Sequence, residues 1–95
     1  MGLFLINARD KAGSLDVRMA NREAHLAYAK DHMDQIKVAG PVLNEAGDMA
    51  GSTLIMEFSS LEEAQNWASN DPYAKAGLFE SVEIIAYKWL LGDGK

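Results

Sequence analysis

Three stretches of the chain have the hydrophobic patterning of β-strands. Residues 3–8 form a short apolar run that ends in charged residues and Gly13, which favours a strand over a helix. Residues 52–58 alternate between two faces, as a pleated strand requires, and residues 81–90 do the same with apolar residues on both faces. One face of the middle strand carries Leu54, Met56 and Phe58.

A fourth strand is expected at residues 36–43, and its proline restricts where it can lie. Pro41 follows Gly40 inside this run, and a proline has no amide hydrogen to donate to a central ladder. The strand therefore lies at an edge of the sheet, is bulged, or ends there. Residues 44–48 form a cluster of turn-forming residues, which predicts a turn directly after it.

A long helix is expected between the first two strands. From Ser14 to about Gln35, apolar residues recur at steps of three and four, with one gap at Arg22. We expect this apolar stripe to lie against the core. It consists of Leu15, Met19, Leu26, Ala29 and Met33.

Two further helix starts are marked by capping residues. Ser60 and Glu63 have the spacing of a capping box, in which the serine oxygen accepts from the amide three residues on and the glutamate reaches back. Asp71 followed by Pro72 is typical of an N-cap and the first helical position, and Gly77 would end that turn. The helix after Ser60 is expected to bury Leu61, Ala64, Trp67 and Ala68.

The resulting order, β-α-β-β-α-β, is the split βαβ arrangement of ferredoxin-like α+β folds. Such an antiparallel sheet has its two helices on one face, and the other face is normally polar. Here the first and last strands are apolar on both faces, so both faces need cover. A second copy of the same sheet would provide it, which predicts a homodimer through sheet-on-sheet packing. Ile84 is taken as an outward position in that interface.

Composition bounds the remaining possibilities. The 95 residues are expected to form a single domain over residues 1–95, with 48% hydrophobic and 24% charged residues. A net charge of -5, with scattered lysines and arginines, argues against nucleic-acid binding. No cysteine is present, so no disulfide or thiolate site can form. No run approaches the ~18 apolar residues of a membrane helix, and the start lacks a signal-peptide pattern. A cytoplasmic protein without membrane association is expected.

His25 is the strongest candidate for chemistry. A histidine exchanges protons near neutral pH, and a distant aspartate such as Asp71 can orient its ring and stabilise the charged form. On one continuous helix, Arg18, Arg22 and His25 would lie within an arc of about 60°. The arginines would disfavour the charged imidazole and leave a neutral general base, or they would hold an anionic substrate. The alternative is a boundary histidine bonded to a neighbour, with Asp71 only a helix cap.

Other candidates also have ordinary structural explanations. Ser52 starts a strand and has no histidine at a spacing that signals a nucleophile pair. His25 and His32 are two helical turns apart, ~10.5 Å, too far for both to bind one metal ion. No nucleotide-binding fingerprint occurs, so neither a metal nor a cofactor is expected. Five aromatic residues could line a pocket for a small aromatic compound, or pack in the core or dimer interface: Trp67, Tyr73, Phe79, Tyr87 and Trp89.

The chain resembles the YCII-related (YciI-like) domain family of dimeric α+β barrels nearly from end to end. The order and spacing of short motifs carry the resemblance: Arg9-Asp10-Lys11, Arg22-x-x-His25-Leu26, Gly40-Pro41, Gly51-Ser52, Ser60-Leu61-Glu62-Glu63-Ala64, Asp71-Pro72-Tyr73 and Gly77. Relatives often have a proline where this chain has Glu23. A proline there would mark a helix start, so the main helix could begin near Arg22, with a separate turn at residues 14–19.

The resemblance implies the ferredoxin-like fold, a dimer and an active site built on a His/Asp pair, here His25 and Asp71. A few related domains are linked to dehalogenation-type steps on chlorinated hydroxyquinones, and more distant barrels to isomerase or monooxygenase chemistry. The leading hypothesis is a cofactor-independent lyase, dehalogenase or isomerase that uses this pair as general acid/base on a small, aromatic or hydroxylated molecule. Substrate contacts would come from Arg22, Arg18, Ser52 and Tyr73.

Two other functions stay open. The chain could be a non-catalytic module that binds a small molecule in the same pocket. It could also be a dimeric accessory or interaction protein in which His25 is structural. The fold alone does not choose between these classes.

Overall fold

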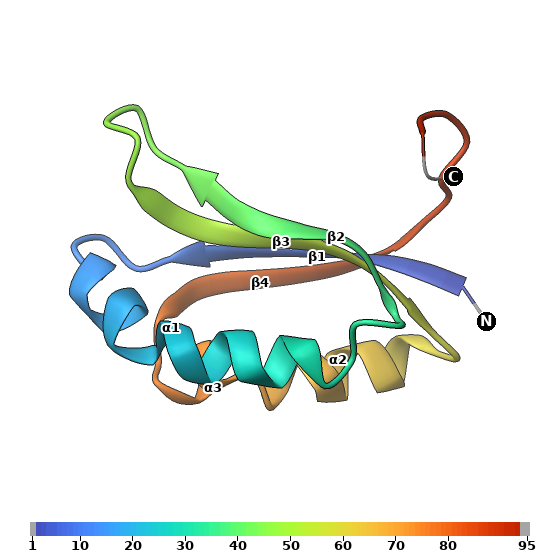
Figure 1. Ribbon diagram of the computed structural model, residues 1–95, viewed down its shortest axis with the longest axis horizontal. Helices are drawn as coiled ribbons and strands as arrows, with labels where there is room; N and C mark the ends of the chain where they lie inside the picture. The colour runs from blue at the N-terminus through green and yellow to red at the C-terminus, as the bar shows by residue number, and fades with distance from the viewer. Residues whose placement is uncertain (1, 94–95) are drawn as a thin grey trace.

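The computed structural model describes residues 2–93 and shows a four-stranded antiparallel sheet with its helices on one face (Figure 1). The elements follow in the order β1 (Gly2–Asp10), α1 (Leu15–Lys30), β2 (Ile36–Leu43), β3 (Met49–Phe58), α2 (Leu61–Ser69), α3 (Pro72–Lys75) and β4 (Phe79–Tyr87). The strands lie in the order β2-β3-β1-β4. This confirms the ferredoxin-like α+β fold. Within residues 2–93, no helix is long and apolar enough to cross a membrane.

Strand β2 lies at the edge of the sheet, as Pro41 predicts, and pairs with β3 alone. Its ladder is irregular near both ends, where the register shifts between Ile36 and Val38 and again between Val42 and Leu43. The turn that follows is held by the Asn44 side chain, which accepts the backbone amides of two later turn residues. Strand β2, which is hydrogen-bonded to a neighbouring strand on one side only, thus forms one border of the helix-covered face.

Helix α1 is one unbroken helix, so the idea of a separate turn at residues 14–19 with a helix start near Arg22 is wrong. It ends at Lys30 rather than near Gln35. The reason is a tertiary contact: the Gln35 amide side chain donates to the Glu57 carbonyl, and the Glu57 amide donates to the Gln35 carbonyl. These bonds hold residue 35 against β3 and draw the chain out of the helix.

The apolar stripe of α1 does not lie in the core, contrary to expectation. Met19 and Met33 are 52% and 59% exposed, and Leu15 and Leu26 are also exposed. The cause is the position of the helix, which packs mainly against α3 and stands away from the β2–β3 side of the sheet. Helical periodicity correctly indicates an apolar face, but that face borders open space.

The core lies instead between α2 and the centre of the sheet, formed by Ile6, Leu54, Met56, Phe58, Ala64 and Trp67. The expected cap is present, because the Ser60 hydroxyl accepts the Glu63 amide at 3.1 Å. Glu63 reaches back to the amide and hydroxyl of Ser59 rather than to Ser60. The expectation that Leu61 is buried is wrong, since it is 44% exposed. It is the first residue of α2, so its side chain lies at the open end of the helix.

The open face of the sheet carries an apolar row, as the sequence predicts, but Ile84 is not part of it. Leu5 pairs with Ile55 on one side and Ile85 on the other, and this row lies on the face without helices. Ile84 pairs with Ile6 and packs against the core, so the outward position is Ile85. Strand β4 also ends at Tyr87 rather than Leu90, because Tyr87 already pairs with Leu3 near the start of β1.

Candidate active site

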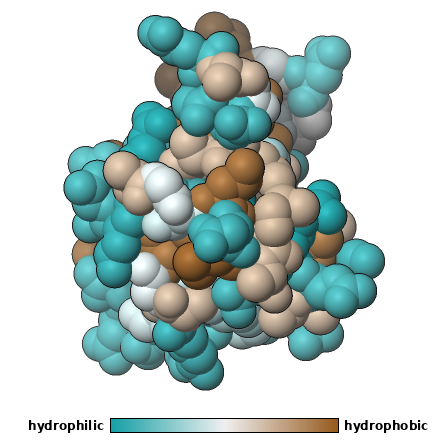
Figure 2. Space-filling view, turned by 90° about the vertical axis from the view of Figure 1, so that its left-hand side faces the viewer, coloured by the Kyte–Doolittle hydropathy of each residue, from teal (hydrophilic) through white to brown (hydrophobic). Residues whose placement is uncertain are grey.

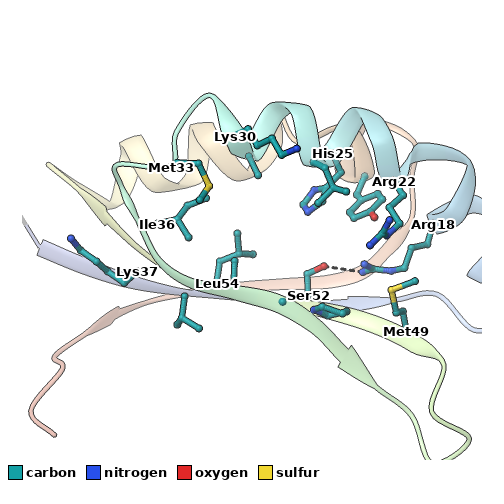
Figure 3. Close-up of a pocket in the computed structure, with 17 residues that line it drawn as sticks. Arg18, Arg22, His25, Lys30, Met33, Ile36, Lys37, Met49, Ser52 and Leu54 are labelled. Atoms are coloured by element: carbon teal, nitrogen blue, oxygen red, sulfur yellow. Dashed lines mark hydrogen bonds between the residues drawn. The ribbon is translucent and has the colours of Figure 1, made fainter. Parts of the chain in front are cut away.

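A groove of about 540 Å³ lies between α1 and the β2–β3 side of the sheet (Figure 3). This volume is in the range of pockets that bind small organic ligands, about 300–1,000 Å³. Seen from the end where α1 begins, hydrophobic residues gather in the middle of the surface and hydrophilic ones surround them (Figure 2). The apolar part of the groove lining includes Leu26, Ala29, Met33, Ile36 and Leu54.

His25 and Asp71, which are far apart in sequence, are hydrogen-bonded beside this groove. The His25 Nδ1 atom lies 2.9 Å from Asp71 Oδ1 and 3.0 Å from Oδ2. A carboxylate only accepts, so Nδ1 is the donor of this bond, and in the neutral imidazole Nε2 is then the nitrogen with a lone pair. His25 lines the groove, and its ring points into it (Figure 3), whereas Asp71 is not among the lining residues. The arrangement presents the unprotonated nitrogen to a ligand.

Asp71 has a second bond that fixes its own position. Its Oδ1 atom accepts the Tyr73 amide at 2.9 Å and so caps the start of α3, with Pro72 at the first helical position. The two alternatives for this residue, helix cap and partner of His25, are therefore both realised by one buried carboxylate. The cap holds the carboxylate where the His25 ring can reach it.

The buried ring of Tyr73 contacts both His25 and Arg18. Its ring stacks on the His25 imidazole at 4.1 Å between centroids, and the Arg18 guanidinium lies 4.5 Å from the same centroid. Burial raises the pKa of the Tyr73 phenol, although Arg18 and Arg22 lower it. The phenol is therefore neutral at ordinary pH and can act as a hydrogen-bond donor toward the groove that it lines.

Arg18 is held by internal contacts. It donates to both carboxylate oxygens of Asp10, at 2.7 and 3.0 Å, and to the Ser52 hydroxyl at 2.9 Å (dashed in Figure 3). Burial acts to lower the pKa of Arg18, but the hydrogen bond to Asp10 and its charge raise it above the usual value. Gly51 beside Ser52 is required, because a Cβ there would lie 2.5 Å from the Ala8 carbonyl oxygen. Arg18 and Ser52 thus border the groove with side chains that are already hydrogen-bonded within the protein.

Arg22 differs from Arg18 although both line the groove. It is exposed, and its guanidinium points into the groove between Arg18 and His25 (Figure 3). Within the described part of the chain, Arg18 is ion-paired with Asp10, and the ring of His25 is hydrogen-bonded to Asp71. Arg22 therefore has an uncompensated charge at the site.

Comparison with known proteins gives the family. The sequence model of the YCII-related domain matches residues 2–88. The chain belongs to the YCII-related domain family. It is 44% identical over 94 residues to Protein YciI of Escherichia coli, covering 90% of this chain and 96% of the relative. It is 36% identical over 94 residues to an uncharacterised protein of Haemophilus influenzae, covering 90% and 95%.

Solved structures include one similar in both sequence and shape. It is a 5-chloro-2-hydroxyhydroquinone dehydrochlorinase from Burkholderia phenoliruptrix in complex with 2,5-dihydroxybenzoquinone, 43% identical, with a TM-score of 0.83 and 95% of each chain covered. An antibiotic biosynthesis monooxygenase, 6% identical with a TM-score of 0.58, covers 96% of this chain and 100% of its own. The latter shares the fold alone.

Several residues of the site in this YCII-related chain are not evident from the sequence. Asp10 lies in a charged run at the end of β1, but strand alternation places it with Ala8 on the helix-covered face, which was the available signal. Lys30 and Lys37 line the groove without any motif. No cluster of three or more potential metal ligands occurs in residues 2–93.

Of the two alternatives for the five aromatic residues, packing outside the groove holds for most of them. Of the five aromatic candidates, Tyr73 lines the groove. Trp67 is in the core under α2, Phe79 lines a much smaller cavity, and Tyr87 belongs to the open sheet face. Trp89 lies beyond β4, where its indole donates to the Leu91 carbonyl. The groove is aliphatic because α1 and β2 supply most of its walls.

Proposed function

We propose that this protein is an enzyme that transfers a proton to or from a small organic molecule bound in the groove. His25 is the general acid/base, and Asp71 is the residue that positions it. The observation that carries the proposal is the 2.9 Å bond from His25 Nδ1 to the buried Asp71 carboxylate, in a histidine that lines the groove. The geometry meets the requirement of a base within reach of a bound substrate.

The steps follow from this arrangement. A substrate in the groove gives a proton to Nε2 of His25, and the resulting imidazolium is stabilised by the Asp71 carboxylate. Stacking on Tyr73 keeps the ring in one orientation. Negative charge that develops on the substrate is stabilised by Arg22, whose guanidinium has no internal partner in the described residues. The proton is then returned to product or solvent.

The similar dehydrochlorinase supports this class of reaction. Its name describes removal of hydrogen chloride from a hydroxylated ring. Such a reaction requires a group that takes up a proton while chloride leaves. The match covers 95% of both chains at 43% identity. We therefore propose small hydroxylated or otherwise acidic organic molecules as substrates.

The test is turnover, measured as chloride release from 5-chloro-2-hydroxyhydroquinone. Thermal-shift hits from a collection of organic acids and phenols give further substrates to assay. Replacing the base in His25→Asn should reduce kcat about 10²–10⁴-fold, and Asp71→Asn should also reduce it strongly. His32→Asn is the matched control, since His32 is on the same stretch of chain but outside the groove.

Turnover that survives in His25→Asn would exclude the proposed base. Binding without turnover of any hit by the wild-type protein would favour the binding module. Folding of each variant is checked by circular dichroism, because Asp71 also caps α3.

We also propose that the protein is a homodimer that buries the open sheet face. The support is the apolar row Ile55–Leu5–Ile85 on that face, with Ile85 44% exposed in one chain. Ile85→Glu should convert the dimer to a monomer in size-exclusion chromatography with light scattering. Leu61→Glu, which puts the same charge on an exposed leucine of α2, should leave the mass unchanged. A monomeric wild-type protein would contradict this proposal.

A further inference from the structure

The groove is lined by cations in a protein that is acidic overall. The chain has a net charge of -5. Yet Arg18, Arg22, Lys30 and Lys37 line the groove, and none of the aspartates and glutamates in residues 2–93 does. A cleft with apolar walls and one sign of charge concentrates ligands of the opposite charge. The ligand of this groove should therefore be an anion.

The cations are not equivalent, and Arg22 is the one available to a ligand. Arg18 is paired with Asp10. Along α1, the residues three and four positions from Arg22 are Arg18, Met19, His25 and Leu26, none of them acidic. Figure 3 shows Arg22 on one side of His25 and Lys30 on the other, whereas the Lys37 side chain leads away from the groove. Arg22 and Lys30 thus flank His25 along the groove.

The groove is long compared with a single ring. Its α1 wall runs from Arg18 to Lys30, which corresponds to roughly 18 Å along a helix axis. Beyond that wall it continues past Met33 and Ile36. Leu54, Met33 and Ile36 lie along the part that leads away from Arg22, whereas Met49 lies near Arg18 (Figure 3). A molecule of one ring placed at His25 would leave this apolar part empty.

We propose that the groove binds an elongated organic anion, with its acidic group at Arg22 and an apolar body larger than one ring extending toward Met33 and Ile36. This inference deepens the proposed function and rests on it for the position of the reacting atom next to His25. It assigns Arg22 as the residue that selects for charge. The apolar wall between Leu26 and Ile36 is the part that selects for length.

The experiment uses two fluorescent probes with the same body and different charge. Anilinonaphthalene sulfonate is an elongated apolar anion, and N-phenyl-naphthylamine is its uncharged counterpart. We expect the wild-type protein to bind the sulfonate at one saturable site per chain and at least about tenfold more tightly than the amine. Equal affinity for the two probes would overturn the assignment of charge selection.

Variants locate the site. Arg22→Gln should weaken binding of the sulfonate about tenfold and leave the amine unchanged, since a charge-assisted contact is removed. Lys75→Gln removes the same charge from an exposed position outside the groove and is the matched control. Leu26→Glu should repel the sulfonate, with Leu61→Glu as its control on α2. Unchanged sulfonate affinity in both Arg22→Gln and Leu26→Glu would place the site elsewhere and overturn the proposal.

Length is tested by displacement of the bound sulfonate. Phenylbutyrate, a ring with an extended acidic chain, should displace it at a concentration at least about tenfold lower than benzoate. Equal potency of the two acids would overturn the claim that the groove selects an elongated body.

The same titration in His25→Asn separates this inference from the proposed function. Binding of the sulfonate should persist there, because Arg22 and the apolar wall are intact. Retained turnover in His25→Asn would exclude the base and leave the anion site standing. Equal affinity of the wild-type protein for the two probes, together with turnover that depends on His25, would overturn the anion site and leave the proposed base standing.

Discussion

The two main helices cover the same face of the sheet in opposite ways. Under α2, Trp67 and Ala64 pack on Met56 and Phe58 and leave almost no exposed surface. Under α1, a groove of about 540 Å³ separates the helix from β2 and β3. One half of the face is a close-packed core, and the other borders an open groove.

The difference teaches that the packed core and the candidate site lie in separate halves of the helix-covered face. Helix α1 is attached by polar and aromatic contacts along its length rather than by an apolar seam, and the bond of His25 to Asp71 is one of them. Arg18 binds Asp10 near its start, and the Tyr28 hydroxyl donates to the Trp67 carbonyl near its end. These anchors hold α1 while its middle stays apart from the sheet, which leaves room for a ligand.

The largest expected effect is on the packed half. Phe58→Ala should reduce the free energy of unfolding by about 3–5 kcal/mol, because Phe58 is fully buried and its removal leaves a cavity. Leu26→Ala in the groove should cost less than about 1 kcal/mol, since Leu26 is 37% exposed and borders open space. Urea unfolding measures both. Similar losses for the two variants would contradict the division into core and groove.

A second contrast concerns the two arginines of α1. Arg18→Met should cost about 3 kcal/mol, because it leaves the buried Asp10 carboxylate without its partner. Arg22→Met should change the free energy of unfolding by no more than about 0.5 kcal/mol, since Arg22 is exposed and unpaired in the described residues. Thermal and urea unfolding give the values. A large loss for Arg22→Met would give that residue a structural role instead.

The helix starts differ as well, with a smaller effect. Ser60→Ala should cost about 1 kcal/mol, because the Ser60 hydroxyl caps α2 by accepting the Glu63 amide. Ser14→Ala should be close to neutral, since Ser14 precedes α1 without a side-chain cap bond. Equal costs, measured by urea unfolding, would show that the start of α1 is capped in solution.

The smallest effect is a loss of stability at alkaline pH that arises on the α1 side. Burial, and then the charge of Asp71, raise the pKa of the Tyr28 phenol above its ordinary value of 10.0. Because the unfolded chain ionises first, the stability that Tyr28 contributes is complete below about pH 10 and decreases as pH rises toward its folded pKa. Urea midpoints at about pH 8 and about pH 11 should differ less in Tyr28→Phe than in the wild-type protein. An identical difference in both would refute the contribution of Tyr28.

Local signals were read correctly where the physics is local. The Ser60 cap, the Asp71-Pro72 helix start and the edge position of the Pro41 strand all depend on a few neighbouring atoms, and the structure has each of them. The facing of Ile84 was misread, because a strand apolar on both faces gives no period to decide which one is inward. The extent of α1 was misread, because Gln35 is held by β3 and not by its own helix.

The candidate site shows the same division between features that depend on neighbouring residues and features that depend on tertiary contacts. The sequence by itself determined the candidates: one histidine with arginines on the same helical face, an Asp-Pro helix start, and the family motifs that connect them. Only the tertiary structure decided that Asp71 lies 2.9 Å from His25, that Arg18 is used internally while Arg22 is not, and that the second half of the apolar stripe, from Leu26 to Met33, lines a groove. The physical reason is that periodicity and capping report the energetics of adjacent residues, whereas a cavity is set by how far apart two packed elements come to rest.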